Sequence, residues 1–223
     1  MSTVHFRDSD ISFRVGKILC LGRNYAEHAR EMKADIPEQP VVFLKPSTAI
    51  IHNGESIRIP AISRDVHHEV ELVVVVGKEG RNIPGERAYD HVAGYAVGLD
   101  MTLRDLQSEA KKRGLPWSVA KGFDTSAPIS LAVEKNRVAD PHKLAISLEV
   151  NGVLKQHSNT GNMIFRIDSI VSFLSSIFTL EPGDLIFTGT PEGVGMVAAG
   201  DRLVAELDSV GTLAVDVRKD FTD

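Results

Sequence analysis

One strand-like run in this chain begins with two carboxylates, and this pairing constrains the fold more than any other feature. Glu69 and Glu71 stand at the start of Val70–Val76, a run of β-branched residues that is typical of a buried strand. Alternate side chains of a strand point the same way, so the two glutamates share a face. Adjacent like charges on an apolar strand are unfavourable unless something neutralises them. Two interpretations follow: a strand end that reaches solvent, or one side of a cation site.

The 223-residue chain has an ordinary globular composition, with 43% hydrophobic and 25% charged residues. Its 25 basic and 30 acidic residues, with no basic stripe, argue against sequence-independent nucleic-acid binding. The polar N-terminus lacks a signal-peptide core, and the apolar runs are too short to span a bilayer. The single cysteine, Cys20, lies in an apolar stretch, which predicts a buried thiol and fits a reducing compartment. We expect a cytoplasmic protein without a nucleic-acid or membrane partner.

Short apolar runs separated by Gly and Pro turns dominate the chain and predict strands. Helical periodicity is scarcer and does not alternate with the strands, which argues against a doubly wound βαβ sheet. We expect an α+β, mostly β protein, with residues 1–16 as a short N-terminal appendage to one domain of residues 17–223. Asn151-Gly152 predicts a type I′ hairpin. The predicted strands cover residues 17–21, 41–44, 70–76, 92–99, 145–150, 184–187, 203–207 and 212–217, and the predicted helices cover 24–33, 102–113 and 169–177, the first with a capping box at Asn24.

Asp100 is the first candidate partner for the glutamate pair. It ends the apolar segment Val92–Leu99, at the point where a strand leaves the core. Three carboxylates without nearby cysteines favour a hard cation with oxygen ligands, Mg²⁺ or Mn²⁺, over zinc. The order is not H-E-x-x-H, which argues against a zinc protease, and His67 and His68 are more typical of hydrogen-bonded neighbours than of ligands. Taken alone, an aspartate that closes a strand is more often a cap or turn former.

His28 and Glu31 lie three residues apart on the first predicted helix and therefore share a face. A histidine oriented by a carboxylate can accept a proton from water near neutral pH, although a solvated helix pair explains the same spacing. Arg23 precedes this helix and suits a substrate carboxylate or a plain surface position. Lys121 lies in an apolar stretch, either facing a ligand or snorkelling to the surface. The glycine-rich residues 187–195 can present N–H groups to anions but lack a P-loop ending.

Together these motifs resemble the fumarylacetoacetate hydrolase family, most closely its short, acylpyruvase-type branch. No single motif is specific, but the ordered set is, and it runs from about Lys17 to near the C-terminus. No catalytic position departs from the family pattern. The matching stretches are Gly22-Arg23-Asn24-Tyr25 with His28 and Glu31, Phe43-Leu44-Lys45-Pro46, His67 to Leu72, Leu99 to Asp105, Leu115-Pro116-Trp117 through Lys121, and Thr188 to Gly195.

The resemblance implies a mixed β-sheet roll with a few short helices, usually a homodimer, in which residues 17–223 form the catalytic domain. It implies that Glu69, Glu71 and Asp100 hold the divalent metal, Mg²⁺ or Mn²⁺. It also implies that His28 and Glu31 form a dyad that activates water, on a segment that can close over the substrate as a lid.

The resemblance further implies that Lys121 stabilises negative charge on the substrate, and that Arg23, Gln107 and Thr190 help to bind it. The expected activity is metal-dependent hydrolysis of a carbon–carbon bond in acylpyruvates or related 2,4-dioxo acids, with release of pyruvate. Other reactions of 2-oxo acids stay open: decarboxylation or tautomerisation of oxaloacetate, and isomerisation of a hydroxylated dienedioate in aromatic catabolism. A non-enzymatic binding protein of the same fold is the alternative from a different class.

Overall fold

Strand β8 (Val70–Val76) is buried along its whole length and lies in the middle of the largest sheet. The computed structural model describes residues 2–32 and 35–220. This sheet contains both parallel and antiparallel pairs and is therefore mixed. Its order is β4 (Val41–Lys45), β3 (Ile18–Gly22), β15 (Leu185–Phe187), β8, β9 (Val92–Leu99), β11 (Ala127–Ile129) and β5 (Ile50–His52), and β12 (Val133–Glu134) also pairs with β9.

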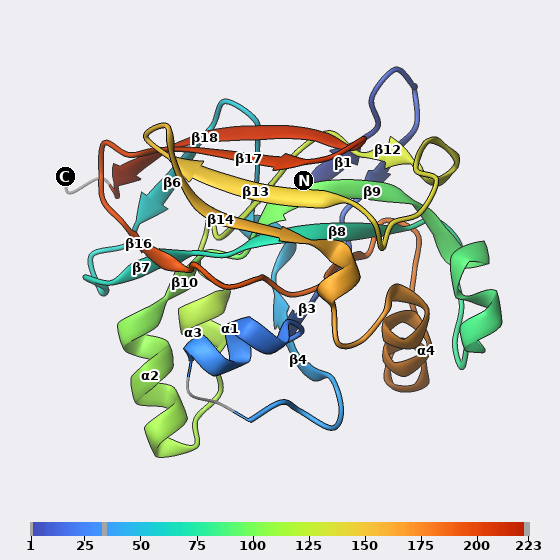
Figure 1. Cartoon of the computed structure of the whole chain (residues 1–223), viewed down its shortest axis with the longest axis horizontal. Coiled ribbons are helices and arrows are strands. Elements are labelled where there is room, and N and C mark those ends of the chain that lie inside the picture. Colours follow the sequence, from blue (N-terminus) through green and yellow to red (C-terminus); the bar gives the residue numbers. More distant parts are fainter. Residues whose placement is uncertain (1, 33–34, 221–223) are drawn as a thin grey trace.

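A second sheet lies against the first and encloses the main core. In Figure 1 this sheet crosses the top of the molecule, and the α-helices lie below it. The described part of the chain also contains two smaller sheets. The second sheet is ordered β14 (Val153–Asn159), β13 (Ala145–Val150), β17 (Arg202–Leu207), β18 (Gly211–Lys219) and β6 (Ser56–Ile59); the small sheets are β10 (Thr102–Leu103), β7 (Val66–His68) and β16 (Gly195–Val197), and β1 (Thr3–His5) with β2 (Ser12–Arg14).

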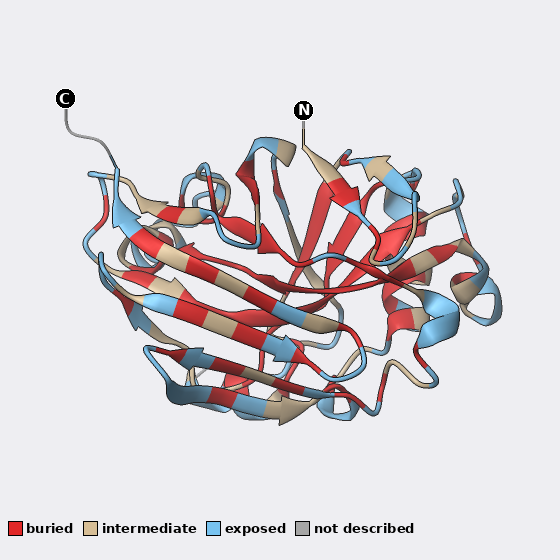
Figure 2. Cartoon of the chain, turned by 90° about the horizontal axis from the view of Figure 1, so that it is seen from above, coloured by how far each residue is buried: buried red, intermediate tan, exposed pale blue. Residues whose placement is uncertain are grey.

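The strand period explains how the core is divided. Val70, Leu72 and Val74 pack into the main core between the sheets, whereas Val73 and Val75 pack into a second apolar cluster on the opposite face of β8. The second sheet is amphipathic, and Figure 2 shows buried and exposed residues alternating along its strands. Because β8 is buried on both faces, any polar side chain at its start is held inside the protein.

The four described α-helices are short and cover the edges of the sheets. Helix α4 packs on the 3₁₀ segment Gly85–His91, and α3 packs against α2 and β4. None of the described helices is long and apolar enough to cross a membrane. The helices are α1 (Ala26–Glu31), α2 (Arg104–Arg113), α3 (Ser118–Lys121) and α4 (Ile167–Ile177).

The predicted strands 70–76, 92–99 and 145–150 are confirmed with their bounds, and the other five strands are confirmed within two residues at each end. The hairpin is also confirmed: φ is 53° at Asn151 and 75° at Gly152, as a type I′ turn requires. Cys20 is fully buried. The division of the chain at residue 16 stays a prediction, although Val4 and Phe6 contribute to the second apolar cluster.

All three predicted helix starts differ from the structure, and α4 begins two residues earlier than expected, at Ile167. Thr102 and Leu103 form strand β10 against His67 and Val66, so α2 begins two residues later than expected. Asn24 does not cap α1, because its side chain donates to the Thr188 carbonyl and so joins the helix entry to a distant loop. Helix α1 ends at Glu31, and residue 33, the predicted end, lies outside the described residues.

Candidate active site

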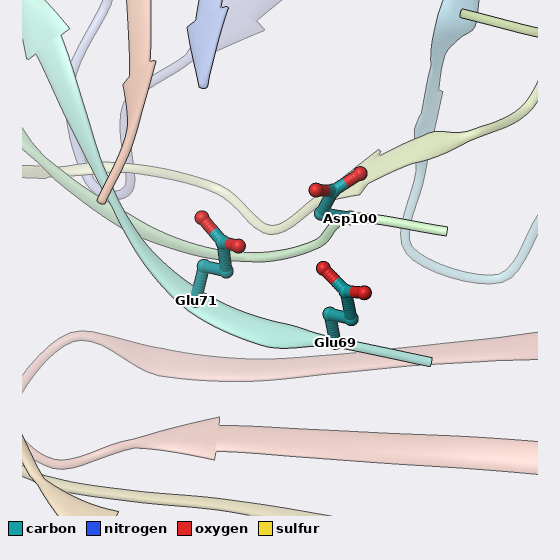
Figure 3. A group of neighbouring side chains, drawn as sticks. All are labelled: Glu69, Glu71 and Asp100. Carbon is teal, nitrogen blue, oxygen red and sulfur yellow. The ribbon is translucent and has the colours of Figure 1, made fainter. Parts of the chain in front are cut away.

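The pairing register of β8 and β9 brings three carboxylates together. Glu71 lies opposite Gly98, and the Asp100 N–H donates to the Glu69 carbonyl at 2.8 Å. Figure 3 shows both glutamates rising from the same face of β8 toward Asp100. One carboxylate oxygen from each residue lies within 4.8 Å of the other two, and their exposed fractions are 5%, 1% and 1%. The predicted carboxylates therefore form one buried cluster, and the interpretation as a solvent-exposed strand end is wrong.

Buried cations surround this triad, which consists of Glu69, Glu71 and Asp100. The Lys121 ammonium lies 2.8 Å from Glu69 Oε2 and 2.5 Å from Asp100 Oδ2. On the other side of Glu69, the Arg104 guanidinium donates to Oε1 at 2.5 Å. Lys45 Nζ lies 2.8 Å from Asp100 Oδ1, although not in hydrogen-bond geometry. Three cations thus stand beside two of the three carboxylates.

Glu71 is the carboxylate without a cationic partner at contact distance among the described residues. Its Oε2 accepts a hydrogen bond from the Gly189 N–H at 2.7 Å, and its Oε1 is buried without a partner. Burial, followed by the charges of Asp100 and Glu69, raises the pKa of Glu71 well above its ordinary value. The Glu71 Oε1 atom, which has no hydrogen-bond partner, is therefore available to coordinate a bound cation. The all-oxygen donor set fits Mg²⁺ or Mn²⁺.

Glu69 shows the opposite tendency. Burial opposes its ionisation, but the charges of Lys121 and Arg104 outweigh burial and lower the pKa of Glu69 below its ordinary value. Burial likewise opposes the charge on Lys121, whereas Asp100 and Glu69 raise the pKa of the lysine. Lys121 is therefore a buried, charged ammonium held at the triad. Of the two positions that the sequence left open, the snorkelling surface position is wrong.

The predicted dyad is assembled beside the triad. His28 is buried on α1, and its Nδ1 lies 3.3 Å from Glu31 Oε2. The Glu31 carboxylate also accepts the Gly193 N–H at 3.1 and 3.2 Å, which joins the helix to the glycine-rich loop. His28 therefore has one ring nitrogen oriented by a carboxylate and the other free to face a ligand.

One cavity of about 290 Å³ connects the dyad to the triad. Its size suits a small organic acid rather than a large ligand. His28 of the dyad and Glu69 of the triad line this cavity, whereas Glu31, Glu71 and Asp100 are not among its lining residues. The predicted residues that line the cavity are Arg23, His28, Glu69, Gln107, Lys121 and Thr190.

Arg23 occupies a backbone conformation that signals a functional position. Its φ is +59°, in the left-handed region that non-glycine residues seldom adopt. The Arg23 side chain lines the cavity, where its guanidinium reaches the Asp35 carbonyl at 3.4 Å. The backbone is thus strained at a residue whose cationic side chain lines the cavity.

The sequence did not predict three residues of the site. Lys45 and Arg104 each lie within a motif that matches the family, but a single basic residue gives no signal of burial. Gln156 came from a strand with no polar motif, yet its Oε1 accepts from Val70 N at 3.1 Å and from His68 Nδ1 at 2.9 Å. Its Nε2 donates to Thr190 Oγ1 at 2.9 Å. Sequence separations of 34 to 88 residues hide these contacts from any local pattern.

The model of the fumarylacetoacetate hydrolase C-terminal domain matches residues 17–218 of the chain. The chain belongs to the fumarylacetoacetate hydrolase family. The family assignment from the ordered motifs is therefore confirmed. It carries over to the fold, because solved members of the family superpose closely on this structure.

Relatives within the family differ in the reaction that their names record. The mitochondrial oxaloacetate tautomerase FAHD1 of Mus musculus is 50% identical over 202 residues, which cover 91% of each chain. Fumarylpyruvate hydrolase from Pseudomonas aeruginosa, crystallised with Mn²⁺ and pyruvate, has a TM-score of 0.94 at 43% identity, over 98% of this chain and 96% of that chain. The 2-hydroxyhepta-2,4-diene-1,7-dioate isomerase of Mycobacterium marinum has a TM-score of 0.83 at 38% identity, over 93% of this chain and 76% of that chain. This chain is therefore an enzyme of a family whose members act on small organic acids.

Proposed function

We propose that this protein is a Mg²⁺- or Mn²⁺-dependent hydrolase that cleaves a carbon–carbon bond in acylpyruvates or related 2,4-dioxo acids and releases pyruvate. The observation that carries the proposal is the common cavity, which joins a carboxylate-oriented histidine to a buried carboxylate triad. The histidine would supply a proton acceptor for water, and the triad would hold a divalent cation that acts as a Lewis acid. The Mn²⁺ and pyruvate bound to the Pseudomonas aeruginosa hydrolase support the same pairing of metal and product class.

In this proposal Glu69, Glu71 and Asp100 hold the ion, which would supply Lewis-acid polarisation of a 2-oxo acid. His28, oriented by Glu31, accepts a proton from water as the water oxygen bonds to the 4-carbonyl carbon. The bond between carbons 3 and 4 then breaks, its electron pair passes to the pyruvate enolate, and carbon 3 takes up a proton.

The remaining cavity residues bind and stabilise the substrate. In this proposal the Lys121 ammonium, which Glu69 and Asp100 already hold in place, stabilises the negative charge that develops on the oxo acid. Arg23, Gln107 and Thr190 line the cavity and provide donors for the substrate oxygens. All these roles use donors that the fold already holds in place.

Keto–enol tautomerisation of oxaloacetate is the second candidate function. The observation that favours it is the 50% identity to oxaloacetate tautomerases across 91% of the chain. Tautomerisation uses the same enolate-stabilising cations but needs no attack by water. His28 would then move a proton between carbon 3 and the solvent instead of activating a nucleophile.

One assay separates the candidates. The purified protein is incubated with Mg²⁺ and acetylpyruvate, fumarylpyruvate or oxaloacetate, and enol absorbance is followed together with pyruvate release. Pyruvate in equal amount to the lost acylpyruvate supports the hydrolase. If oxaloacetate undergoes enol–keto exchange but neither acylpyruvate yields pyruvate, the protein is a tautomerase and not a hydrolase. If the only reaction is release of carbon dioxide from oxaloacetate, the protein is a decarboxylase.

We also propose that the protein acts as a homodimer in the cytoplasm. Two large exposed apolar side chains support the first part: Ile62 and Met196 have exposed fractions of 60% and 61%. Light scattering of the purified protein tests the oligomeric state, and a monomeric mass would contradict it. The buried, reduced Cys20 is compatible with the second part.

A further inference from the structure

Among the described residues, two cations that line the cavity, Arg23 and Lys111, have no carboxylate at ion-pair distance. Lys45, Arg104 and Lys121 are already engaged by Glu69 and Asp100 of the triad. Lys111 lines the same cavity but has no carboxylate at ion-pair distance within residues 2–32 and 35–220. It is thus a surplus positive charge directed at a ligand-sized space.

Helix α2 places this lysine at the outer end of the cavity. Arg104, Gln107 and Lys111 lie at positions i, i+3 and i+7, so they share one face of the helix, and all three line the cavity. Arg104 contacts Glu69, which fixes the inner end of the row at the triad. A helix rises 1.5 Å per residue, so Lys111 begins about 10 Å further along the axis.

Trp117 holds the lysine at this position. The Lys111 ammonium lies 5.0 Å from the centroid of the Trp117 ring, and that ring lines the cavity and lies 6.0 Å from the ring of Phe43. Partial burial, followed by the positive charges of Arg104 and Lys121, lowers the pKa of Lys111. The lysine is therefore kept in an environment that disfavours its charge, and a bound anion would reverse that.

A purely structural role accounts less well for Lys111. Cations in the last turn stabilise a helix through its dipole, and Lys112 and Arg113 satisfy that need equally. Lys111 and Lys112 are both exposed, but only Lys111 lines the cavity. The helix dipole therefore explains a basic last turn, but not why the Lys111 ammonium lies over the Trp117 ring beside the cavity.

We propose that Lys111 binds the distal carboxylate of a 2-oxo dicarboxylic acid whose oxo-acid end lies at the triad, which makes the enzyme selective for dianionic over monoanionic substrates. The inference rests on the proposed function, because it assigns the orientation of the substrate in that same site. Lys111 is here a specificity-determining residue and takes no part in bond cleavage.

Binding of two unreactive ligands tests the selectivity directly. 2-Oxoglutarate and 2-oxopentanoate share a five-carbon skeleton and differ by a distal carboxylate in place of a methyl group. Calorimetry with Mg²⁺ present should show tighter binding of 2-oxoglutarate to the wild type. Lys111→Met keeps the length and apolar stem of the lysine but should weaken 2-oxoglutarate about tenfold, the loss of one charge-assisted bond, and leave 2-oxopentanoate unchanged.

Two further variants give the controls. Lys112→Met removes a neighbouring charge from outside the cavity and should change neither affinity, whereas Lys111→Arg should retain most of the preference. In turnover, Lys111→Met should lower kcat/KM for fumarylpyruvate relative to acetylpyruvate by a similar factor.

The inference would be overturned if Lys111→Met weakened the affinity for both ligands equally or for neither. It would also be overturned if the wild type bound the two ligands with equal affinity or bound neither. Failure of the proposed function is distinguishable, since it appears as absence of pyruvate release while the dianion preference in binding persists.

Discussion

Gln156 fixes the hydrogen-bond direction of Thr190. The Gln156 side-chain amide donates from Nε2 to Thr190 Oγ1 at 2.9 Å, while its Oε1 accepts from Val70 N and pairs with His68 Nδ1. Because the threonine oxygen is already an acceptor, its own proton is available for a ligand in the cavity. Gln156, fully enclosed on β14, is therefore a positioning residue that makes the Thr190 hydroxyl a donor.

The first prediction follows from this contact. Gln156→Glu keeps the acceptor for Val70 but replaces the amide donor, so Thr190 would turn its proton toward the new carboxylate. We expect KM for the acylpyruvate to rise with a smaller change in kcat, and Thr190→Val to do the same. In the double variant the two increases should not add. Additive increases in KM would show that Gln156 acts independently of the hydroxyl.

The second prediction concerns the triad. Glu69→Gln and Asp100→Asn each remove a ligand and leave buried cations unpaired, so metal binding by calorimetry should weaken at least about tenfold and metal-dependent turnover should be abolished. Glu79→Gln, an exposed acidic position, is the matched control and should change neither. Thermal unfolding of each variant separates loss of the ligand from loss of the fold. Full activity in either triad variant would refute the metal assignment.

The third prediction is a pH dependence set by Glu71. Burial and the neighbouring carboxylates raise the pKa of Glu71 in the folded, metal-free protein above the ordinary value of 4.5. The folded state therefore binds more protons than the unfolded state above pH 4.5, so the free energy of unfolding falls as the pH rises, by at most about 1.4 kcal/mol per pH unit. Glu69, whose pKa is lowered, acts in the opposite direction and at lower pH.

Urea unfolding with a chelator between pH 5 and pH 8 measures this slope. Glu71→Gln should flatten it and stabilise the metal-free protein at the upper end, although it removes a ligand. Because Mg²⁺ must displace the proton, affinity for the ion should increase with pH in the wild type. Parallel stability curves for the wild type and Glu71→Gln would show that this carboxyl is not the source.

The fourth prediction separates chemistry from metal binding in the dyad. His28→Ala should bind Mg²⁺ with unchanged affinity but hydrolyse acylpyruvates about 10² to 10⁴ times more slowly, the usual contribution of a general base. Glu31→Gln should show a smaller loss of kcat. Glu27 lies on the same helix and pairs with Arg30 at the surface, so Glu27→Gln is the control. Wild-type hydrolysis by His28→Ala would remove the dyad from the mechanism.

The fifth prediction uses two glycines with similar backbone angles. Gly189 (φ +96°) donates its N–H to Glu71, and a Cβ there would lie 2.6 Å from the Asn24 Cβ; Gly54 (φ +85°) has open space around it. Gly54→Ala should cost about 1 kcal/mol of stability, from backbone strain alone. Gly189→Ala should cost more and weaken Mg²⁺ binding as well, because the loop must shift away from Glu71. Equal costs with unchanged metal affinity would contradict this account.

The sequence predicts the strands better than it predicts the contacts within the site. Val92–Leu99 is apolar throughout and Val70–Val76 is apolar except for Glu71, so these runs predict the bounds of both strands. The two-residue period of a strand then predicts the shared face of Glu69 and Glu71. Thr102 looked helical because local spacing cannot detect its pairing with His67, which lies on a strand more than thirty residues earlier.

Contacts across the fold limit the prediction of the site for the same reason. Asn24 has the spacing of a helix cap, but tertiary hydrogen bonds to Thr188 and Phe165 compete for its side chain. Gln156 gives no local signal, since its partners belong to other strands and loops. The motifs therefore predicted which residues meet, but not the cations and amides that orient them.

Glu31 joins two parts of the protein that the chain itself separates by more than 160 residues. Its carboxylate orients His28 within α1 and at the same time accepts the Gly193 N–H of the glycine-rich loop. In the proposed mechanism the base is therefore complete only while the helix is docked on that loop. Shielding of the cavity and activation of water then become simultaneous rather than successive. Water that enters the site while the helix is undocked would meet the metal and the substrate without a proton acceptor. Such water would therefore not be activated, even though the open cavity admits it.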